Sequence, residues 1–253
     1  MKLRAENLVK IYKGRKVVNH VSVEVKQGEI VGMLGPNGAG KTTTFYMVVG
    51  LVKPNKGNIF LEDESITGLP VYKRARKGLG YLAQEASVFR NLSVEDNIRS
   101  VLQMKKLSKK EIEARVESLL DEFSITHVRK NKGKVLSGGE RRRTEIARTL
   151  AVNPKFVLLD EPFAGVDPLA VEEIQRIVYH LKHKNIGILI TDHNADAILS
   201  ITDRAYVMKE GTLFAHGSPE DLVENPDVKK GYLGENYTLN RKFRKEEIFK
   251  ESD

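Results

Sequence analysis

The sequence predicts an α/β fold with a parallel-sheet core, an antiparallel β region and an inserted helical segment. Apolar runs at residues 29–34, 156–160 and 187–191 each adjoin helical sequence, as expected for strands buried on both faces of a parallel sheet. Residues 21–26 alternate apolar and polar side chains, which is typical of a half-exposed antiparallel strand. From about residue 93 to 151 the apolar positions recur at helix spacing.

The composition is that of a globular protein. The chain has 253 residues, of which 40% are hydrophobic and 30% charged, a length that suits one large α/β domain or two small ones. No apolar run approaches the roughly 18 to 20 residues that span a bilayer, and the charged start has no signal-peptide core. The absence of cysteine excludes disulfides and thiolate metal sites, and it fits a reducing cytoplasm.

The charge balance is basic, with a net charge of +8 and a pI of about 9.4. Such a balance suits nucleic acid, an anionic membrane face or a phosphate-rich ligand. A solvated basic surface without a partner explains it equally well.

The sequence pattern also predicts the order of helices and strands along the chain. The strand at residues 29–34 leads through a glycine-rich loop into a helix expected at 41–51. The helical stretch carries apolar side chains at helix spacing, namely Ile112, Val116, Leu119, Leu120 and Phe123. Residues 205–208 and 213–215 predict a hairpin around Lys209-Glu210-Gly211-Thr212. Residues 241–253 are dense in both charges and predict a frayed helix or a disordered tail.

A phosphate-binding loop is predicted after the first buried strand, where residues 35–42 satisfy G-x-x-x-x-G-K-[ST]. Glycines let the backbone fold around phosphates and present N–H groups, and the following helix adds its positive end. Lys41 is expected to reach the β- and γ-phosphates, and Thr42 to bind Mg²⁺. The alternative is an ordinary glycine-rich turn. The predicted nucleotide-binding residues here are Gly35, Pro36, Asn37, Gly38, Ala39, Gly40, Lys41, Thr42 and Thr43.

Two carboxylates end the buried strand at residues 156–160. Asp160 is expected to lie beside the phosphate loop and to hold Mg²⁺, and Glu161 to polarise the attacking water. Taken alone, such a pair is more often a solvated strand end. The pairing with a phosphate loop favours the functional interpretation.

A short motif, Leu-Ser-Gly-Gly-Glu at residues 136–140, stands between the phosphate loop and the Asp-Glu strand. Ser137 and Glu140 fit a capping box, so a plain helix start is the structural alternative. Gly138 and Gly139 also expose N–H groups at a positive helix end, which is an anion site. In this position the motif resembles the signature of ABC ATPases. The fold is accordingly expected to be an ABC-type P-loop ATPase.

Four further positions resemble motifs of that family, and the resemblance covers nearly the whole chain. Tyr12 stands where the family has its adenine-stacking aromatic, with a core tyrosine as the alternative. Gln84 resembles the glutamine that senses Mg²⁺ and contacts the membrane partner. Residues 164–167 resemble the loop that crosses the dimer interface, and His193 resembles the switch histidine at the γ-phosphate.

The resemblance implies a mechanism and a set of partners. Two copies face each other, so that Ser137, Gly138, Gly139 and Glu140 of one close on ATP bound by the other. The implied catalytic residues are Lys41, Glu161 and His193, and the implied Mg²⁺ ligands are Thr42, Gln84 and Asp160. Two transmembrane subunits are expected to contact residues 84–90, with Phe89 either seated in that contact or part of the core. A cytoplasmic protein, peripheral to the inner membrane, follows.

Within the family the chain is most similar to the cytoplasmic ATPases of lipopolysaccharide export. The stretches that carry this likeness are residues 81–90, 160–168, 190–194 and 232–237. ATPases of branched-chain amino-acid importers are the alternative. Nucleic-acid-associated ABC ATPases are more remote, because no long coiled-coil insert or second phosphate loop is present, and no nucleic-acid partner is expected. The expected division is an ATPase domain at 1–239, with a helical subdomain at about 86–151, and a charged tail at 240–253.

Overall fold

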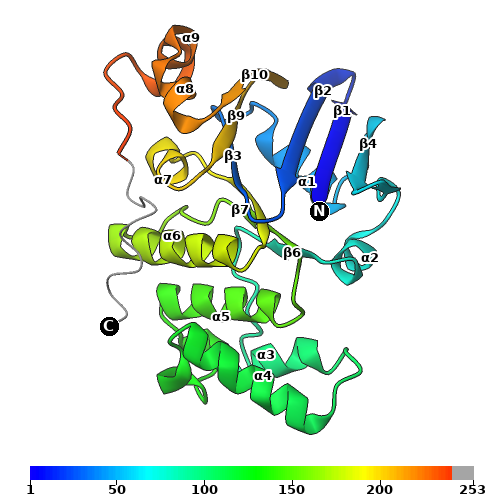
Figure 1. Ribbon diagram of the computed structural model, residues 1–253, viewed down its shortest axis with the longest axis vertical. Coiled ribbons are helices and arrows are strands. Elements are labelled where there is room, and N and C mark those ends of the chain that lie inside the picture. Colours follow the sequence, from blue (N-terminus) through cyan, green and yellow to red (C-terminus); the bar gives the residue numbers. More distant parts are fainter. Residues whose placement is uncertain (241–253) are drawn as a thin grey trace.

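Two sheets build the protein, and the computed structural model describes residues 1–240 of it (Figure 1). The larger sheet has the order β10-β9-β3-β8-β7-β6. Its neighbours pair in parallel except for β10, which runs antiparallel to β9. The smaller sheet, of order β2-β1-β4-β5, is antiparallel. The predicted α/β fold with a parallel core and an antiparallel region is confirmed.

The strands have the following bounds: β1 Lys2–Tyr12, β2 Arg15–Lys26, β3 Ile30–Leu34, β4 Lys56–Leu61, β5 Glu64–Ser65, β6 Leu79–Leu82, β7 Phe156–Asp160, β8 Gly187–Thr191, β9 Arg204–Lys209 and β10 Thr212–Gly217. The helices are α1 Lys41–Val49, α2 Val71–Arg76, α3 Val94–Leu102, α4 Lys109–Glu122, α5 Gly138–Leu150, α6 Pro168–His183, α7 Ala195–Leu199, α8 Pro219–Glu224 and α9 Pro226–Val228, with single turns η1 Thr126–Val128, η2 Gly133–Val135 and η3 Lys229–Leu233.

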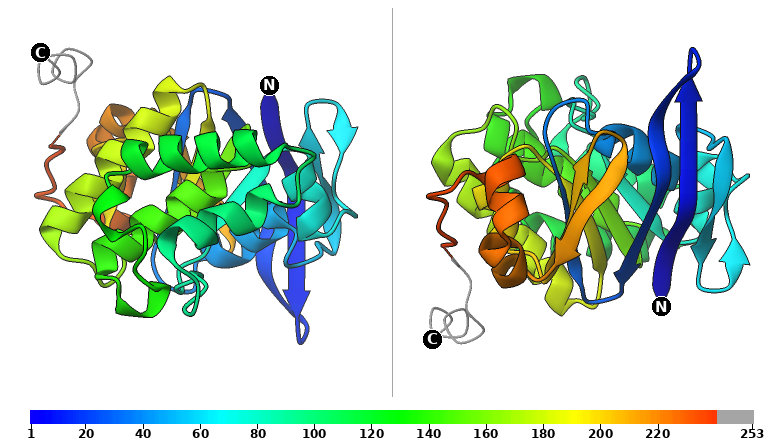
Figure 2. Two further views of the ribbon diagram at one scale, coloured as in Figure 1. Left: turned by 90° about the horizontal axis from the view of Figure 1, so that it is seen from below. Right: turned by 90° about the horizontal axis from the view of Figure 1, so that it is seen from above.

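The core lies on both faces of the larger sheet, because successive strand residues point to opposite sides. In β8, Ile188 and Ile190 face the cluster formed with α3–α7, whereas Leu189 faces the cluster formed with α1 and the antiparallel sheet. All five residues of β3, β7 and β8 are buried in each case. Burial on both faces explains why these strands read as continuous apolar runs. Figure 2 shows α3–α5 on one side of the molecule and the β1–β2 pair with the β9–β10 hairpin on the other.

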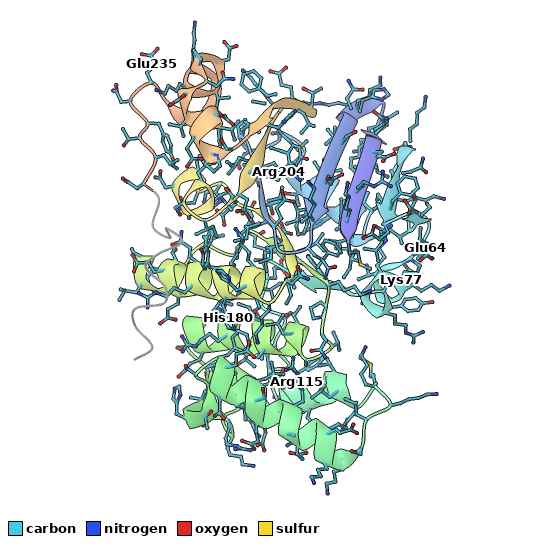
Figure 3. All side chains as sticks on the ribbon, viewed as in Figure 1. Glu64, Lys77, Arg115, His180, Arg204 and Glu235 are labelled. Carbon is cyan, nitrogen blue, oxygen red and sulfur yellow. The ribbon has the colours of Figure 1, made fainter. Side chains whose placement is uncertain are left out.

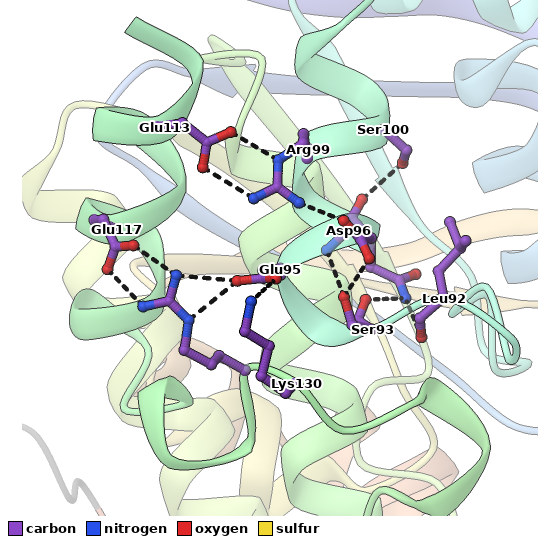
Figure 4. A network of polar contacts seen from close by, with 11 residues as sticks. Leu92, Ser93, Glu95, Asp96, Arg99, Ser100, Glu113, Glu117 and Lys130 are labelled. Carbon is purple, nitrogen blue, oxygen red and sulfur yellow. Dashed lines mark hydrogen bonds and ion pairs between the residues drawn. The ribbon is translucent and has the colours of Figure 1, made fainter. Parts of the chain in front are cut away.

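The helical stretch between β6 and β7 holds α3, α4 and α5, and α4 begins with a capping box at Ser108. A polar network ties α3 to its neighbours (Figure 4). Arg99 of α3 bonds both oxygens of Glu113 on α4, each at 2.9 Å. Glu95, only 8% exposed in its side chain, accepts hydrogen bonds from Arg129 and Lys130. These bonds satisfy a buried carboxylate that would otherwise destabilise the fold.

Helix α1 ends earlier than the expected residue 51. Gly50 adopts a left-handed conformation (φ 96°) and donates to the carbonyl of Tyr46, which is a common way for a helix to stop. Arg74, only 2% exposed, caps the same end, because it donates to the carbonyls of Met47 and Val48 at 2.8 and 2.6 Å. The α1 terminus is therefore anchored to α2.

Ion pairs link strands of both sheets to neighbouring segments. Lys77, at the end of α2, lies 2.7 Å from the carboxylate of Glu64 in β5 (Figure 3). Arg204 of β9 bonds Glu29, the residue before β3. Of the predicted charged tail, residues 241–253 lie outside the described residues.

Candidate functional site

The carboxyl ends of four neighbouring strands gather the predicted residues. The strand order β3-β8-β7-β6 places the phosphate loop, Asp192 and His193, Asp160 and Glu161, and Gln84 side by side. The register pairs Asp160 with Thr191 and Met33 with Thr191, so these ends lie level. Ligands of open parallel sheets bind at such an edge. Segments far apart in sequence thus form one candidate site.

The glycines of the phosphate loop are required by close approaches and by their backbone conformation. A Cβ at Gly35 (φ 141°) would lie 2.2 Å from the carbonyl oxygen of Met208, and one at Gly40 (φ 97°) 2.6 Å from that of Val17. Gly38 (φ 79°) is different, since no atom lies within 4 Å of its Cβ position. The loop is therefore held tightly at both ends and open in the middle, as a phosphate cradle requires.

Lys41 begins α1, where the chain offers an anion site. The residue is 6% exposed, and its Nζ donates to the carbonyls of Gly35 at 2.6 Å and Pro36 at 3.1 Å. Burial lowers the pKa of Lys41, and the nearby Glu161 and Asp192 carboxylates oppose that shift. Because no side chain caps α1 at its start, the first N–H groups remain available to a phosphate. Thr42 is exposed and Thr43 half-buried in the first turn.

Asp160 ends β7 in a buried position, 1% exposed. Its Oδ1 accepts a hydrogen bond from Thr191 Oγ1 at 3.1 Å, whereas its Oδ2 has no partner among the described residues. Burial raises the pKa of this carboxyl, and the hydroxyls of Thr191 and Tyr46 act in the opposite direction. A buried carboxylate oxygen without a partner suits a hard cation such as Mg²⁺.

Glu161, Gln84 and His193 meet although they follow three different strands. Glu161 adopts a left-handed conformation (φ 40°), uncommon for a residue other than glycine, and its N–H bonds the carbonyl of Thr191 at 2.8 Å. Its Oε2 accepts a hydrogen bond from Gln84 Nε2 at 3.1 Å and lies 3.6 Å from His193 Nδ1. The geometry brings a candidate general base next to a candidate switch histidine and a candidate Mg²⁺ ligand.

Asp192 is a site residue that sequence reasoning missed. It is fully buried, and its two oxygens accept the N–H groups of Asn194 and Phe163, each at 2.9 Å. His193 Nδ1 also lies 3.4 Å from Asp192 Oδ1. Asp192 therefore joins the loop after β8 to the loop after β7. A charged residue directly after a buried strand was the signal for it.

The signature residues form the capping box that was the structural alternative. Ser137 Oγ accepts the N–H of Glu140 at 3.3 Å, and the Glu140 carboxylate accepts the N–H of Ser137 at 2.8 Å. Gly138 nevertheless has open space at its Cβ position, and Ser137 is exposed. The capping box therefore uses the Ser137 and Glu140 side chains and leaves the backbone of Gly138 accessible.

Tyr12 lies at the end of β1 and is 45% exposed, so the core alternative for it is wrong. The ammonium of Lys10 lies 5.0 Å from its ring centre. The β1–β2 hairpin reaches the phosphate loop through Val17, whose carbonyl faces Gly40. An exposed ring on this hairpin suits a stacking contact with a flat base.

Residues 1–240 contain neither a preformed metal cluster nor a membrane-spanning helix. No group of three or more His, Asp or Glu side chains in this part of the chain forms a metal site. A Mg²⁺ ion held by one carboxylate, a threonine, a glutamine and substrate phosphates needs no such group. None of the helices in the same residues has the length and apolar character needed to cross a bilayer.

Known proteins similar to this chain share one family. The family model described as ABC transporter matches residues 18–164. The lipopolysaccharide export system ATP-binding protein LptB of Escherichia coli K12 is 57% identical over 238 residues, which cover 94% of this chain and 99% of that protein. The protein of the same name from Haemophilus influenzae is 53% identical over 94% of this chain and 99% of its own length.

Solved structures agree with the sequence relatives. The crystal structure of the ADP conformation of an ATP-binding cassette of an ABC transporter is 30% identical, with a TM-score of 0.82, and covers 93% of this chain and 100% of that one. The cbiO1 subunit of the cbiONQ ABC transporter complex from Clostridium perfringens is 30% identical, with a TM-score of 0.81, over 90% of this chain and 92% of its own. The chain belongs to the ABC transporter family, as an ATP-binding and ATP-hydrolysing subunit.

Proposed function

We propose that this subunit powers lipopolysaccharide export from the inner membrane toward the outer membrane. The observation that carries the proposal is the identity of 57% over nearly the full length of an export ATPase of that name. In this role the protein works in the cytoplasm, peripheral to the inner membrane, with two transmembrane subunits and no nucleic acid. The domain at residues 1–239 supplies the motor, with residues 86–151 as its helical subdomain.

Residues at the carboxyl ends of the strands divide the work on ATP. The loop from Gly35 to Thr43 cradles the phosphates, with Lys41 Nζ moving from loop carbonyls to phosphate oxygens. Tyr12 stacks on the adenine. Mg²⁺, when bound with ATP, neutralises charge on the phosphates, and Thr42, Gln84 and Asp160 would hold it. Asp160 Oδ2 is the oxygen that fits this role best, because it is buried and without a partner among the described residues.

Hydrolysis requires a water positioned on the γ-phosphate. Glu161 accepts its proton, since its carboxylate lies at the edge of the phosphate site with Gln84 and His193. His193 contacts the γ-phosphate. Gln84 bonds Glu161, so a single hydrogen bond joins the ion-sensing residue to the general base.

A homodimer completes the site. Ser137, Gly138, Gly139 and Glu140 lie at the start of α5, outside the cluster at the strand ends. The exposed Ser137 and the open Gly138 can therefore close on ATP held by a second copy, where the helix N-terminus stabilises negative charge. ATP then holds the two copies together, and hydrolysis releases them.

The transmembrane partners contact residues 84–90. Phe89 is 49% exposed, which excludes the core alternative, and the Arg148 guanidinium lies 4.8 Å from its ring centre. An exposed ring stacked on an arginine offers an anchor for a short partner helix. Arg90, exposed beside it, adds a charged contact.

Removal of the Phe89 ring is expected to uncouple the complex. Phe89→Ala should leave a folded subunit that binds ATP. The yield of complex with the membrane subunits should fall about tenfold or more, because an aromatic side chain that becomes buried in an interface contributes about 2 kcal/mol or more to binding. Co-purification and ATP binding measure the two effects. Phe214→Ala is the matched control, since Phe214 is also exposed and lies under a cation, Lys209 at 5.4 Å. Normal assembly of Phe89→Ala would contradict the contact.

Depletion in the native cell tests the transported substrate. Loss of an export motor should stall lipopolysaccharide at the inner membrane and stop growth on any medium. Loss of a branched-chain amino-acid importer should only impair uptake, and rich medium should bypass much of that. Surface labelling of lipopolysaccharide and uptake of labelled leucine distinguish the two. Normal surface lipopolysaccharide with lost leucine uptake would replace the proposal by the importer.

A further inference from the structure

The segment between β6 and α3, residues 83–93, holds both Gln84 and Phe89, and its first half has little backbone support. None of the backbone–backbone hydrogen bonds found among the described residues involves the N–H or carbonyl groups of residues 84–88. A segment that carries an ion-sensing residue and a partner contact still needs a defined position. Its support must come from side chains.

Glu145 of α5 supplies most of that support. Its side chain is 2% exposed, and its Oε1 accepts the backbone N–H groups of Ser87 at 2.6 Å and Val88 at 3.0 Å. Its Oε2 lies 3.4 Å from Arg142 Nη1. One buried carboxylate thus satisfies two adjacent N–H groups that have no backbone partner. Such charge-assisted bonds are among the stronger hydrogen bonds of a protein.

Two arginines on the same face of α5 extend the attachment. Arg142 donates to the carbonyl of Ala83 at 2.9 Å, one residue before Gln84. Arg148 donates to Ser87 Oγ at 2.7 Å and stacks on Phe89. Residues 142, 145 and 148 are spaced by three, so they share one helix face. This face contacts the segment from residue 83 to residue 89.

The far end of the segment is held by α3 instead. Asn97, fully buried, accepts the N–H of Phe89 at 2.8 Å and donates to the carbonyl of the same residue at 3.1 Å. The two attachments meet between Val88 and Phe89. Glu145 is therefore the residue by which α5 holds the backbone of Ser87 and Val88, directly before Phe89.

We infer that Glu145 is a positioning residue that fixes the Ser87–Val88 backbone on α5, so that the signature at the start of α5 and the partner contact at Phe89 move as one body. The second half rests on the proposed roles of Ser137 and Phe89. Glu145 lies about two turns after Ser137 on the same helix, and a helix transmits displacement of one end to the other. Closure of the dimer at Ser137 would then displace the partner contact directly.

Amide hydrogen exchange of the intact protein tests the attachment independently of any partner. In Glu145→Gln the N–H groups of Ser87 and Val88 should exchange about tenfold faster or more, because each loses a charged acceptor. Glu145→Asp keeps the charge but is one methylene shorter, and it should give an intermediate rate in a protein that folds. Unchanged exchange at both amides in both variants overturns the attachment.

The complex with its membrane subunits tests the coupling. Glu145→Gln should lower transport per ATP hydrolysed about fivefold or more, because α5 no longer holds the backbone that leads into Phe89. This ratio is normalised to hydrolysis, so a change in the ATPase rate that comes from displacement of Gln84 does not alter it. Glu117→Gln is the matched control, a carboxylate of the same helical region that pairs with Arg129 at 2.6 Å. Faster exchange with normal transport per ATP overturns the coupling and leaves the attachment. An inert Phe89→Ala would instead overturn the proposed partner contact.

Discussion

Glu161→Gln is expected to abolish hydrolysis and keep ATP binding. The amide has the shape of the carboxylate but cannot accept the proton of the attacking water, and general bases contribute about 10²- to 10⁴-fold to such rates. The variant should keep its fold, because Gln84 Nε2 still finds an oxygen acceptor at the same position. ATP should then persist between two copies, so a stable dimer should accumulate in the presence of ATP and Mg²⁺.

Turnover with labelled ATP and size-exclusion chromatography measure both effects. Glu210→Gln is the matched control, because Glu210 is also a glutamate in the left-handed region (φ 51°), at the β9–β10 turn. It should change neither the rate nor the dimer. Near-normal turnover of Glu161→Gln within the assembled complex would remove Glu161 from the role of general base.

Lys41→Ala and Ser137→Ala should each be inactive alone and regain activity when mixed. Lys41 loses a direct phosphate contact, so ATP affinity should fall about ten- to a hundredfold. In the proposed dimer, Ser137 acts on the ATP of the second copy. In a mixed dimer one composite site carries both substitutions and the other carries neither, so the intact site can turn over. The recovered activity should approach half that of the unmodified protein in the mixed-dimer fraction.

A capping role alone for Ser137 gives another pattern. Ser137→Ala would then lower the free energy of unfolding by about 1 kcal/mol and leave the turnover of folded protein intact. Melting temperature and specific activity measured together distinguish the two. Lys155→Ala is the control for Lys41, since Lys155 is exposed at the opposite end of β7.

Local sequence patterns determine much of the fold. The apolar runs at residues 156–160 and 187–191 predict strands with the bounds that β7 and β8 have. Such runs are nearly continuous because both faces of each strand are buried. The strand β1 was not predicted, and the helical sequence expected beside β7 and β8 had no predicted bounds, which α6 supplies. β1 mixes charges into its pattern and carries irregular register with β2, so no clean alternation marks it.

The site residues divide in the same way. Lys41, Asp160 and Glu161 belong to short motifs that can be recognised in the sequence. The phosphate loop, for example, directly follows a strand, so its residues are consecutive. The hydrogen bond between Gln84 and Glu161, which are 77 residues apart, cannot be predicted from such local motifs. It depends on the strand order, in which β6 and β7 are neighbours although three helices separate them in sequence.

The sequence by itself determined the family, the phosphate loop and the residue types of the site, because these are local arrangements of glycine, lysine and carboxylates. Only the tertiary structure decided which buried polar groups lack a hydrogen-bond partner within residues 1–240 and which bond to a distant segment. Asp160 Oδ2 has no hydrogen-bond partner there, although Thr191 of β8 donates to the other oxygen of the same carboxylate. Glu145 is occupied because the segment at Ser87 lies against α5. Burial and pairing of a charge depend on what the rest of the chain places around it, and no window of sequence contains that information.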